Sequence, residues 1–230
     1  MTQPATPALC ASLCLALGVA LLAPPAHAAK KKDKVFTGTL DDGRLEVSWY
    51  SSEGLNFRET DEADYLWVKE GFSIEGRTFQ MLPWPEPDFI GDDADERDRE
   101  DREMAEEMAE RMADILADIW GDEWEGMAST SREDGDVKVH GRIVDASTGS
   151  AVASAIVGWG AGSGSATVDI KLVDAASGEL LVSLHHRETM DAQWWATDES
   201  DFADWIEELA EDARKQGLSS LYQKGGGIDD

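Results

Sequence analysis

The sequence predicts an α/β fold in which a mixed, mostly antiparallel sheet is packed by two main helices. The first observation is strict alternation over Ala166–Leu172, where apolar residues take every second position, as in a strand with one buried face. A second alternating stretch follows the turn Asp174–Gly178 and predicts a β-hairpin. The third observation is two stretches, residues 104–120 and 202–213, with apolar residues three and four positions apart, as in helices.

The chain begins with a predicted secretion signal, residues 1–28. An apolar run from Leu9 to Leu22 is followed by two prolines and by Ala26-His27-Ala28, an Ala-x-Ala cleavage site. The segment before the run contains no lysine or arginine, which departs from the usual signal. The run is too short for a membrane-spanning helix. We therefore expect an exported envelope protein, located in the periplasm or secreted after cleavage.

The two cysteines, Cys10 and Cys14, both lie inside the predicted signal, so the mature chain contains none. Disulfide and thiol chemistry are therefore not expected. Leu13 stands where a lipid-attachment motif needs a small residue, which argues against a lipid anchor. The formal net charge of −28 argues against nucleic acid and anionic membranes as partners. It suits solubility, a basic partner or weakly held divalent cations, and an acidic solvated face is the simplest explanation.

Removal of the signal leaves about 200 residues, enough for one domain with its own core. We divide the mature chain into a polar N-terminal arm or edge hairpin at residues 29–62, one α/β domain at residues 63–224 and a flexible tail at residues 225–230. In the arm, Asp41-Asp42-Gly43 is a hairpin-type turn.

Two strands are expected at the start of the domain. Tyr65–Phe72 is rich in aromatic and β-branched residues and predicts the first of them. A second, shorter strand is expected within Ser73–Trp84, before prolines end regular structure.

The first main helix is expected to begin in the acidic run after Asp92, because the helix dipole favours acidic residues near its N-terminus. Gly121 is expected to end it. A stripe rich in methionine fits either a groove for a partner or the protein core, and core packing is the preferred interpretation. The stripe consists of Met104, Met108, Met112, Ile115 and Ile119.

Two segments of the β-rich half share a pattern. Ile143–Gly149 and Leu172–Gly178 each place an aspartate after two apolar residues and end on glycine. We interpret Asp145 and Asp174 as turn formers that accept backbone hydrogen bonds, and the pattern as a shared hairpin solution.

The last helix is expected to begin at a cap formed by Thr197 or Asp198 and to end near Gly217. Its apolar stripe consists of Phe202, Trp205, Ile206, Leu209 and Ala213.

Three tryptophans are candidate contact residues. Trp159 lies in a glycine-rich turn that is not a phosphate-binding loop, because Ser163 replaces a required glycine and a strand follows. Packing over the end of the sheet is the alternative for Trp159. Trp194 and Trp195 fit a stacking platform, with packing at a hairpin edge or interface as the default.

No catalytic, cofactor-binding or metal-binding residue is assigned. His185 and His186 are adjacent and point to opposite faces of a strand, and a zinc site needs three or four converging ligands that His140 does not complete. No serine stands out as a nucleophile, and the carboxylates are too numerous to single out a catalytic pair. No cofactor is expected.

The glycine turn Val157–Gly162 and the hairpin Asp174–Glu179 are similar to a GFGAG turn and a D-A-x-T-G-E hairpin, with Trp159 in place of Phe and Ser177 in place of Thr. In these motifs the chain resembles an exported bacterial family of domains of unknown function. Its layout is similar to the α/β domains of the curli-secretion lipoprotein and the penicillin-binding-protein activator lipoprotein. The resemblance implies an α/β fold and an envelope location, and it supplies no catalytic residue.

The leading hypothesis is a non-enzymatic envelope protein that binds another protein or assembles with itself. The alternatives are a hydrolase acting on an envelope polymer and an acidic cation-binding protein. A deep pocket with clustered polar residues would favour the hydrolase, whereas an exposed apolar patch or an open sheet edge would favour the binding protein.

Overall fold

The computed structural model describes residues 34–149, 164–190 and 201–228. Within these residues the main sheet is 8-stranded, in the order β10-β3-β4-β9-β8-β7-β5-β6. All neighbouring strands are antiparallel except that β5 runs parallel to β6 and β7. The predicted α/β fold with a mixed, mostly antiparallel sheet is confirmed.

Three long strands form the centre of the sheet, and short strands flank them. The central strands are β7 (Val137–Ser147), β8 (Gly164–Asp174) and β9 (Leu180–Met190). The short strands are β3 (Arg58–Glu59), β4 (Tyr65–Val68), β5 (Thr78–Met81), β6 (Ser129–Ser131) and β10 (Gly226–Gly227).

The turn between β8 and β9 is the predicted hairpin. Asp174 accepts hydrogen bonds from the backbone N–H groups of Ala176 and Ser177 and from the Ser177 hydroxyl. Gly178 has a φ of +75°, which glycine adopts without strain. Asp174 is therefore a turn former, as predicted.

The long helix α2 (Arg99–Glu123) begins at a capping box. Asp98 accepts from the N–H groups of Glu100 and Asp101, and Asp101 accepts in return from the N–H of Asp98. The expectation that Gly121 ends the helix is wrong, because α2 continues to Glu123. A Cβ at Gly121 would lie 3.0 Å from the Thr130 hydroxyl of β6, so the glycine gives that strand room to approach.

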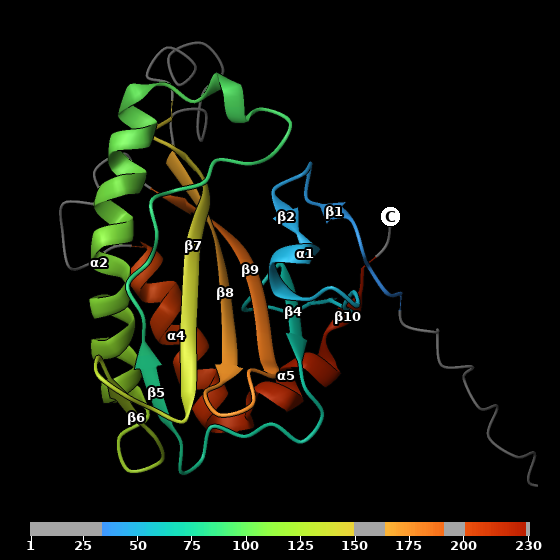
Figure 1. Ribbon diagram of the computed structural model, residues 1–230, viewed down its shortest axis with the longest axis vertical. Helices are drawn as coiled ribbons and strands as arrows, with labels where there is room; N and C mark the ends of the chain where they lie inside the picture. Colours follow the sequence, from blue (N-terminus) through green and yellow to red (C-terminus); the bar gives the residue numbers. More distant parts are fainter. Residues whose placement is uncertain (1–33, 150–163, 191–200, 229–230) are drawn as a thin grey trace, which may run out of the picture. The chain divides into compact units, whose positions relative to one another are not determined.

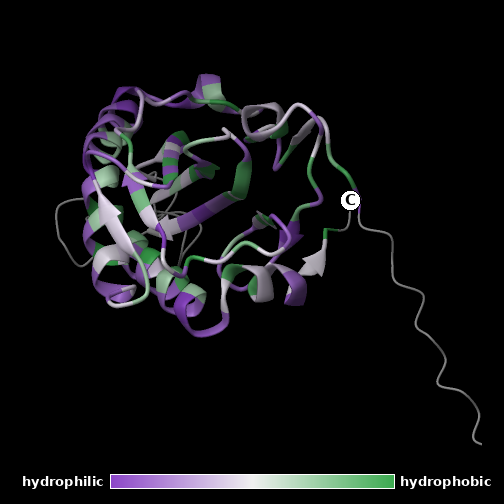
Figure 2. Ribbon diagram, turned by 60° about the horizontal axis from the view of Figure 1, so that its bottom comes forward, coloured by the Kyte–Doolittle hydropathy of each residue, from purple (hydrophilic) through white to green (hydrophobic). Residues whose placement is uncertain are grey.

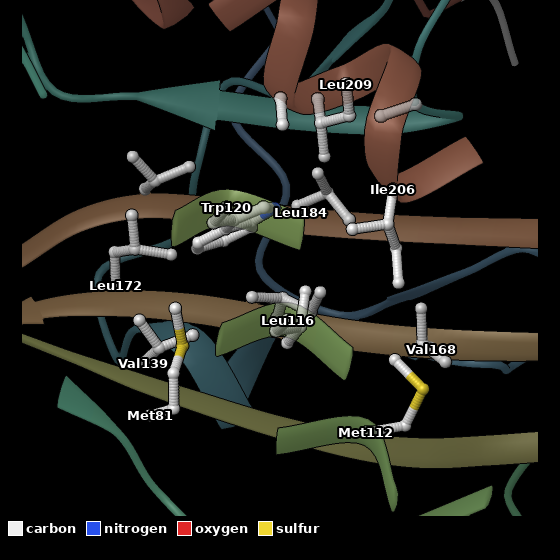
Figure 3. Packing of buried hydrophobic residues seen from close by; sticks show 14 of the residues in the cluster. Met81, Met112, Leu116, Trp120, Val139, Val168, Leu172, Leu184, Ile206 and Leu209 are labelled. Atoms are coloured by element: carbon white, nitrogen blue, oxygen red, sulfur yellow. The ribbon is translucent and has the colours of Figure 1, made fainter. Parts of the chain in front are cut away.

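The methionine stripe of α2 is part of the main core, between the sheet and the helices (Figure 3). Met104, Met108 and Met112 are buried, as predicted. Ile115 and Ile119 are only partly buried beside the core, which is a correction. Leu116 and Trp120, each one position further along the helix, take the buried positions instead.

Helix α4 (Asp201–Gln216) packs beside α2 on the same side of the sheet, and the short α5 (Leu218–Lys224) follows it. The predicted stripe from Phe202 to Ala213 is buried. The candidate caps at residues 197–198 lie outside the described residues.

Residues 34–57 form a segment that we call the strap. It contains the small hairpin β1 (Thr39–Leu40) and β2 (Leu45–Glu46), the short helix α1 (Val47–Tyr50) and a second apolar cluster, separate from the main core. Figure 1 shows α2 on one side of the central strands and β1, β2 and α1 on the other. The strap therefore covers the sheet face opposite the long helices.

The predicted tail begins with three glycines, and the last two of them form β10. This strand pairs with β3 at one edge of the sheet. In Figure 2 the outer sides of the helix ribbons are mainly hydrophilic, and hydrophobic positions lie toward the interior. Among the described residues, no helix has both the length and the apolar character needed to cross a membrane.

Candidate functional site

The sheet face beneath the strap carries polar residues at alternate strand positions. Strand pairing places Arg142 of β7 opposite Asp169 of β8, and Asp169 opposite His185 of β9. These three side chains are nearly inaccessible, with 4%, 0% and 0% exposure. The alternating pattern predicted one buried face of β8, and the structure buries both because the strap covers the second one.

Asp169 lies between two cations. Its Oδ1 is 2.6 Å from Nδ1 of His185, and its Oδ2 accepts a hydrogen bond from Nε of Arg142 at 2.8 Å and forms an ion pair with Nη2 of the same arginine at 2.7 Å. Both carboxylate oxygens are therefore used, which is what a buried carboxylate requires.

His185 connects this row of charges to the strap. Its Nε2 lies 3.2 Å from Oδ2 of Asp41 in the turn between β1 and β2. Burial alone would lower the pKa of His185, but hydrogen bonds and charge attraction from Asp169 and Asp41 outweigh it and raise the pKa to about 9. The imidazole is therefore a cation at neutral pH and donates to a carboxylate from each ring nitrogen.

A second ionic cluster forms around Arg44, which lies in the same turn of the strap hairpin as Asp41. Asp145 of β7 accepts from Nε of Arg44 at 3.1 Å and from Nε of Arg97 at 2.6 Å. Asp93 contacts both arginines, each at 2.8 Å. The prediction that Asp145 is a turn former is wrong. It lies within β7 and is 1% exposed, because a β-bulge beside it directs its side chain toward the strap.

Trp49 of α1 lies over two basic side chains of the sheet. The Arg142 guanidinium carbon is 4.7 Å from the centroid of its ring system, and Nζ of Lys171 is 4.0 Å from it. Nζ of Lys171 also donates to the backbone carbonyl of Trp49 at 2.6 Å. Burial and the nearby Arg142 charge lower the pKa of Lys171. We call this arrangement the tryptophan slot.

The next residue anchors the strap more deeply. Tyr50 is buried, and its hydroxyl donates to the carbonyl of Leu184 in β9 at 2.7 Å. Burial, with the Asp169 charge, raises the pKa of this hydroxyl well above its usual value, so Tyr50 stays a neutral donor.

Two hydroxyls on the polar face are left over. Thr167 Oγ1 and Ser183 Oγ are both fully buried and have no hydrogen-bond partner among the described residues. An unpaired buried hydroxyl costs free energy, so the strap satisfies most of this face but not all of it.

Arg142, Asp169 and His185 form a row of charged side chains across three strands, which we call the charged row. Its contacts are those that hold the strap on the sheet and not those of a reaction centre. A catalytic acid or base must reach a substrate proton, whereas the polar atoms of Asp169 and His185 point at each other, at Arg142 and at Asp41. Within the described residues, no group of three or more His, Cys, Asp or Glu side chains is placed to hold a metal ion.

Two open grooves lie beside β10. The first has a volume of about 420 Å³ and is lined by Asp41, Glu59, Asp64 and Arg187, among others. The second has a volume of about 400 Å³ and is also lined by Glu59, together with Asp61, Glu62 and Asp212. Burial and the neighbouring Asp212 raise the pKa of Glu62.

The predicted contact residues Trp159, Trp194 and Trp195 all lie outside the described residues. His185 and His186 lie on opposite faces, as predicted: His186 stacks on Trp205 of α4 with ring centroids 4.4 Å apart. His140 pairs with Lys171, so β8 separates it from His185.

Sequence reasoning missed Arg142 and Asp169, and treated His185 only as a rejected metal ligand. The sequence did contain a sign of this row, because each of three neighbouring strands has a charged residue at a position on its polar face. The row could be recognised only with the strand register, which places these positions side by side.

The region that matches a known protein family includes the charged sheet face but only the end of the strap. A model of a family described as "Domain of unknown function (DUF4410)" matches residues 53–192, more than half of the chain. The chain belongs to the DUF4410 family. The matched region contains the whole charged sheet row, whereas Asp41, Arg44 and Trp49 of the strap precede it.

Comparisons of this chain with curated proteins and with solved structures give no match and weak similarity, respectively. No curated protein matches it. Among solved structures it is weakly similar to a PelC dodecamer from Paraburkholderia phytofirmans, with 13% identity, a TM-score of 0.38, and coverage of 68% of this chain and 98% of that one. A PelC variant from the same organism, also a dodecamer, gives 11% identity, the same TM-score of 0.38, and coverage of 68% and 94%.

Proposed function

We propose that this protein is an exported, non-enzymatic envelope protein that binds an extended, basic segment of another protein along the β10 edge of its sheet. The observation that carries the proposal is the edge itself. Gly226 and Gly227 are both exposed, and β10 has a sheet neighbour on one side only, β3. A Cβ built on either glycine meets no heavy atom within 4 Å. An exposed edge of this kind accepts an extended peptide through main-chain hydrogen bonds.

The charge of the surroundings supports a basic partner. Carboxylate side chains line both grooves beside β10, and Glu59 contributes to each groove. Burial is the main reason that the pKa of Glu62 is raised, and repulsion from the neighbouring Asp212 carboxylate adds to it. A lysine or arginine side chain placed there would reduce that repulsion, so charge selects basic segments over acidic ones.

The envelope location rests on the sequence. The apolar run and Ala-x-Ala site at residues 1–28 support export and cleavage. The resemblance of the motifs to an exported family, and of its layout to the curli-secretion and penicillin-binding-protein activator lipoprotein domains, supports the same compartment. Self-assembly, the second form of binding in the leading hypothesis, would involve a different surface, the sheet face beneath the strap.

A charge-reversal pair tests the edge. Glu59→Lys changes one exposed residue that lines both grooves, and Glu107→Lys makes the same change on the exposed side of α2. The probe is an acetylated, amidated peptide of alternating lysine and valine, with binding measured by fluorescence anisotropy at low salt. We expect Glu59→Lys to weaken binding severalfold and Glu107→Lys to leave it nearly unchanged.

The same pair is used with envelope extract. A natural partner should be captured by the wild-type mature protein and by the Glu107→Lys variant, and lost with Glu59→Lys. Equal peptide binding by both variants, or capture that does not depend on Glu59, would show that the β10 edge is not the binding surface.

A further inference from the structure

We propose that the polar sheet face also accepts the strap of a second copy of this chain, so that two molecules associate by exchanging residues 34–57. This inference does not require binding at β10, because it uses the sheet face opposite the long helices; Asp41 is a residue that the strap contact and the first groove share. The occupant is defined by contacts that the strap already makes inside one molecule.

The strap can move as a unit. Its apolar residues form a cluster of their own, with Leu45, Val47 and Tyr50 at the centre, and none of these belongs to the main core of sheet and helices. Release of the strap would therefore leave the helix-side core intact. The strap ends at Phe57, directly before β3, which is paired with β4 and β10, so the hinge would lie at the junction of Phe57 and Arg58.

The family boundary agrees with this division. The DUF4410 match begins at Glu53, so most of the strap lies before it, while the face that the strap covers lies within it. The face is thus a part of the domain, and the strap that occupies it is a segment added to the domain.

Electrostatics favours this face as the meeting point of two copies. The chain has a net charge of −28, so outer surfaces of two molecules repel each other. The face beneath the strap presents the cations Arg142, Lys171 and His185, and the strap brings the carboxylate of Asp41 and the electron-rich ring of Trp49. An exchanged strap joins two molecules through opposite charges that lie in one row, without contact between the acidic helices.

The face keeps unmet hydrogen-bonding groups while its own strap is seated. Thr167 Oγ1 and Ser183 Oγ, both fully buried, lack a partner among the described residues. The internal strap benefits from an effective concentration of about millimolar order. Exchange is therefore expected to grow with protein concentration.

Mixing two variants tests the exchange directly. Trp49→Ala weakens the strap and leaves the face intact, whereas Lys171→Met weakens the face and leaves the strap intact. Both residues are only partly buried, which limits the effect on folding. In a mixture, the intact strap of one variant fits the intact face of the other, and neither variant can make that contact with itself.

The measurement is native mass spectrometry of the mixture, with one variant labelled with ¹⁵N, at concentrations where the wild type is mainly monomeric. We expect at least tenfold more mixed dimer than either variant forms alone. The control mixture combines Trp49→Ala with Asp41→Asn, both altered in the strap, and should form no excess of mixed dimer.

Two outcomes would overturn the proposal. One is a mixture of Trp49→Ala and Lys171→Met with no more dimer than its components. The other is equal dimer formation in the control mixture, which would place the contact outside the strap and the face. Thermal unfolding of each variant is measured first, and Lys171→Gln replaces Lys171→Met if the latter does not fold.

Discussion

The two faces of the central sheet are both buried, but by different chemistry. On the helix side, Val168 and Ile170 of β8 lie against apolar side chains of α2 and α4, and burial of apolar area stabilises the contact. On the strap side, Thr167 and Asp169 of the same strand are equally inaccessible. Ion pairs of Asp41 with His185 and of Arg44 with Asp145, together with cation–π contacts of Trp49, hold the strap there.

The two faces differ in how many different side chains each can accept as packing partners. Apolar contacts have no strong directional requirement, so the helix side accepts side chains of about the right volume. Buried charges must each have a partner at hydrogen-bond distance, because an unpaired buried charge is severely unfavourable. The strap face therefore accepts only a segment that places a carboxylate near His185 and an aromatic ring over Lys171. Such a surface selects its occupant.

The largest effect is expected from Asp169→Ala. This change removes the carboxylate between Arg142 and His185 and leaves two buried cations facing each other. Breaking a buried ion pair in this way costs about 3–5 kcal/mol in the free energy of unfolding. Urea titration at pH 7 measures the loss, with the exposed Asp134→Ala as the control that should change little. A loss below about 1 kcal/mol would mean that the row contributes no more than a surface pair.

On the helix side, Leu116→Ala is expected to cost about 3 kcal/mol through lost apolar transfer and the cavity left behind. Leu116 is 1% exposed at the centre of the contact between α2 and the sheet. The adjacent Ile115→Ala is the matched control, because Ile115 is only partly buried and should cost less. Equal losses would indicate that α2 is rotated relative to the structure.

The helix side was largely predictable from the sequence, because the periods of strand and helix directly encode which residues are apolar neighbours. The stripe on α2 was misplaced by one residue at Ile115 and Ile119, and the end of the helix by the local effect of Gly121. Both errors arose because the contact with Thr130 and the position of the helix on the sheet are tertiary features.

The strap side was not predictable by the same means. A polar residue at every second position ordinarily indicates a face in water, and that expectation failed at Thr167 and Asp169. The β-bulge that turns Asp145 inward also has no clear pattern in the sequence, which is why its resemblance to Asp174 misled. The covering segment lies about a hundred residues away in the chain, as the contact between Arg44 and Asp145 shows.

The pH dependence of stability should separate the two faces. The pKa of His185 is raised from 6.5 in the unfolded chain to about 9 in the folded protein. Its contribution, roughly 3 kcal/mol, is fully present below pH 6.5 and is lost as the pH rises through about 9. Urea titrations between pH 6 and 9.5 should therefore show falling stability.

Two other groups on this face, His140 and Asp41, act outside that window, whereas the lowered pKa of Lys171 acts with the opposite sign as the pH rises toward 10.5. The pKa of His140 is lowered by burial and by Lys171 and Lys138, so its effect has the opposite sign and is confined to pH below 6.5. The pKa of Asp41 is lowered by the hydrogen bond to His185, so its contribution is present above pH 3.8 and is lost as the pH falls through its folded value. Leu116→Ala should keep the alkaline slope, and Asp41→Asn should reduce it. An unchanged slope in Asp41→Asn would contradict the role of the strap in holding the charge of His185.

The smallest effect concerns the tryptophan slot, and it decides whether the strap is held by charge or only by apolar area. Trp49→Ala should cost about 1–2 kcal/mol, since a desolvated cation–π contact contributes on this order. Apolar area alone would give a similar loss, so the single variant does not discriminate. A double-mutant cycle with Lys171→Met does, because it isolates the coupling between ring and ammonium group. We expect a coupling of about 1 kcal/mol, since Nζ lies 4.0 Å from the ring centroid. A coupling near zero would mean that Trp49 only covers the face, and that the selectivity of the strap depends on Asp41 and His185 alone.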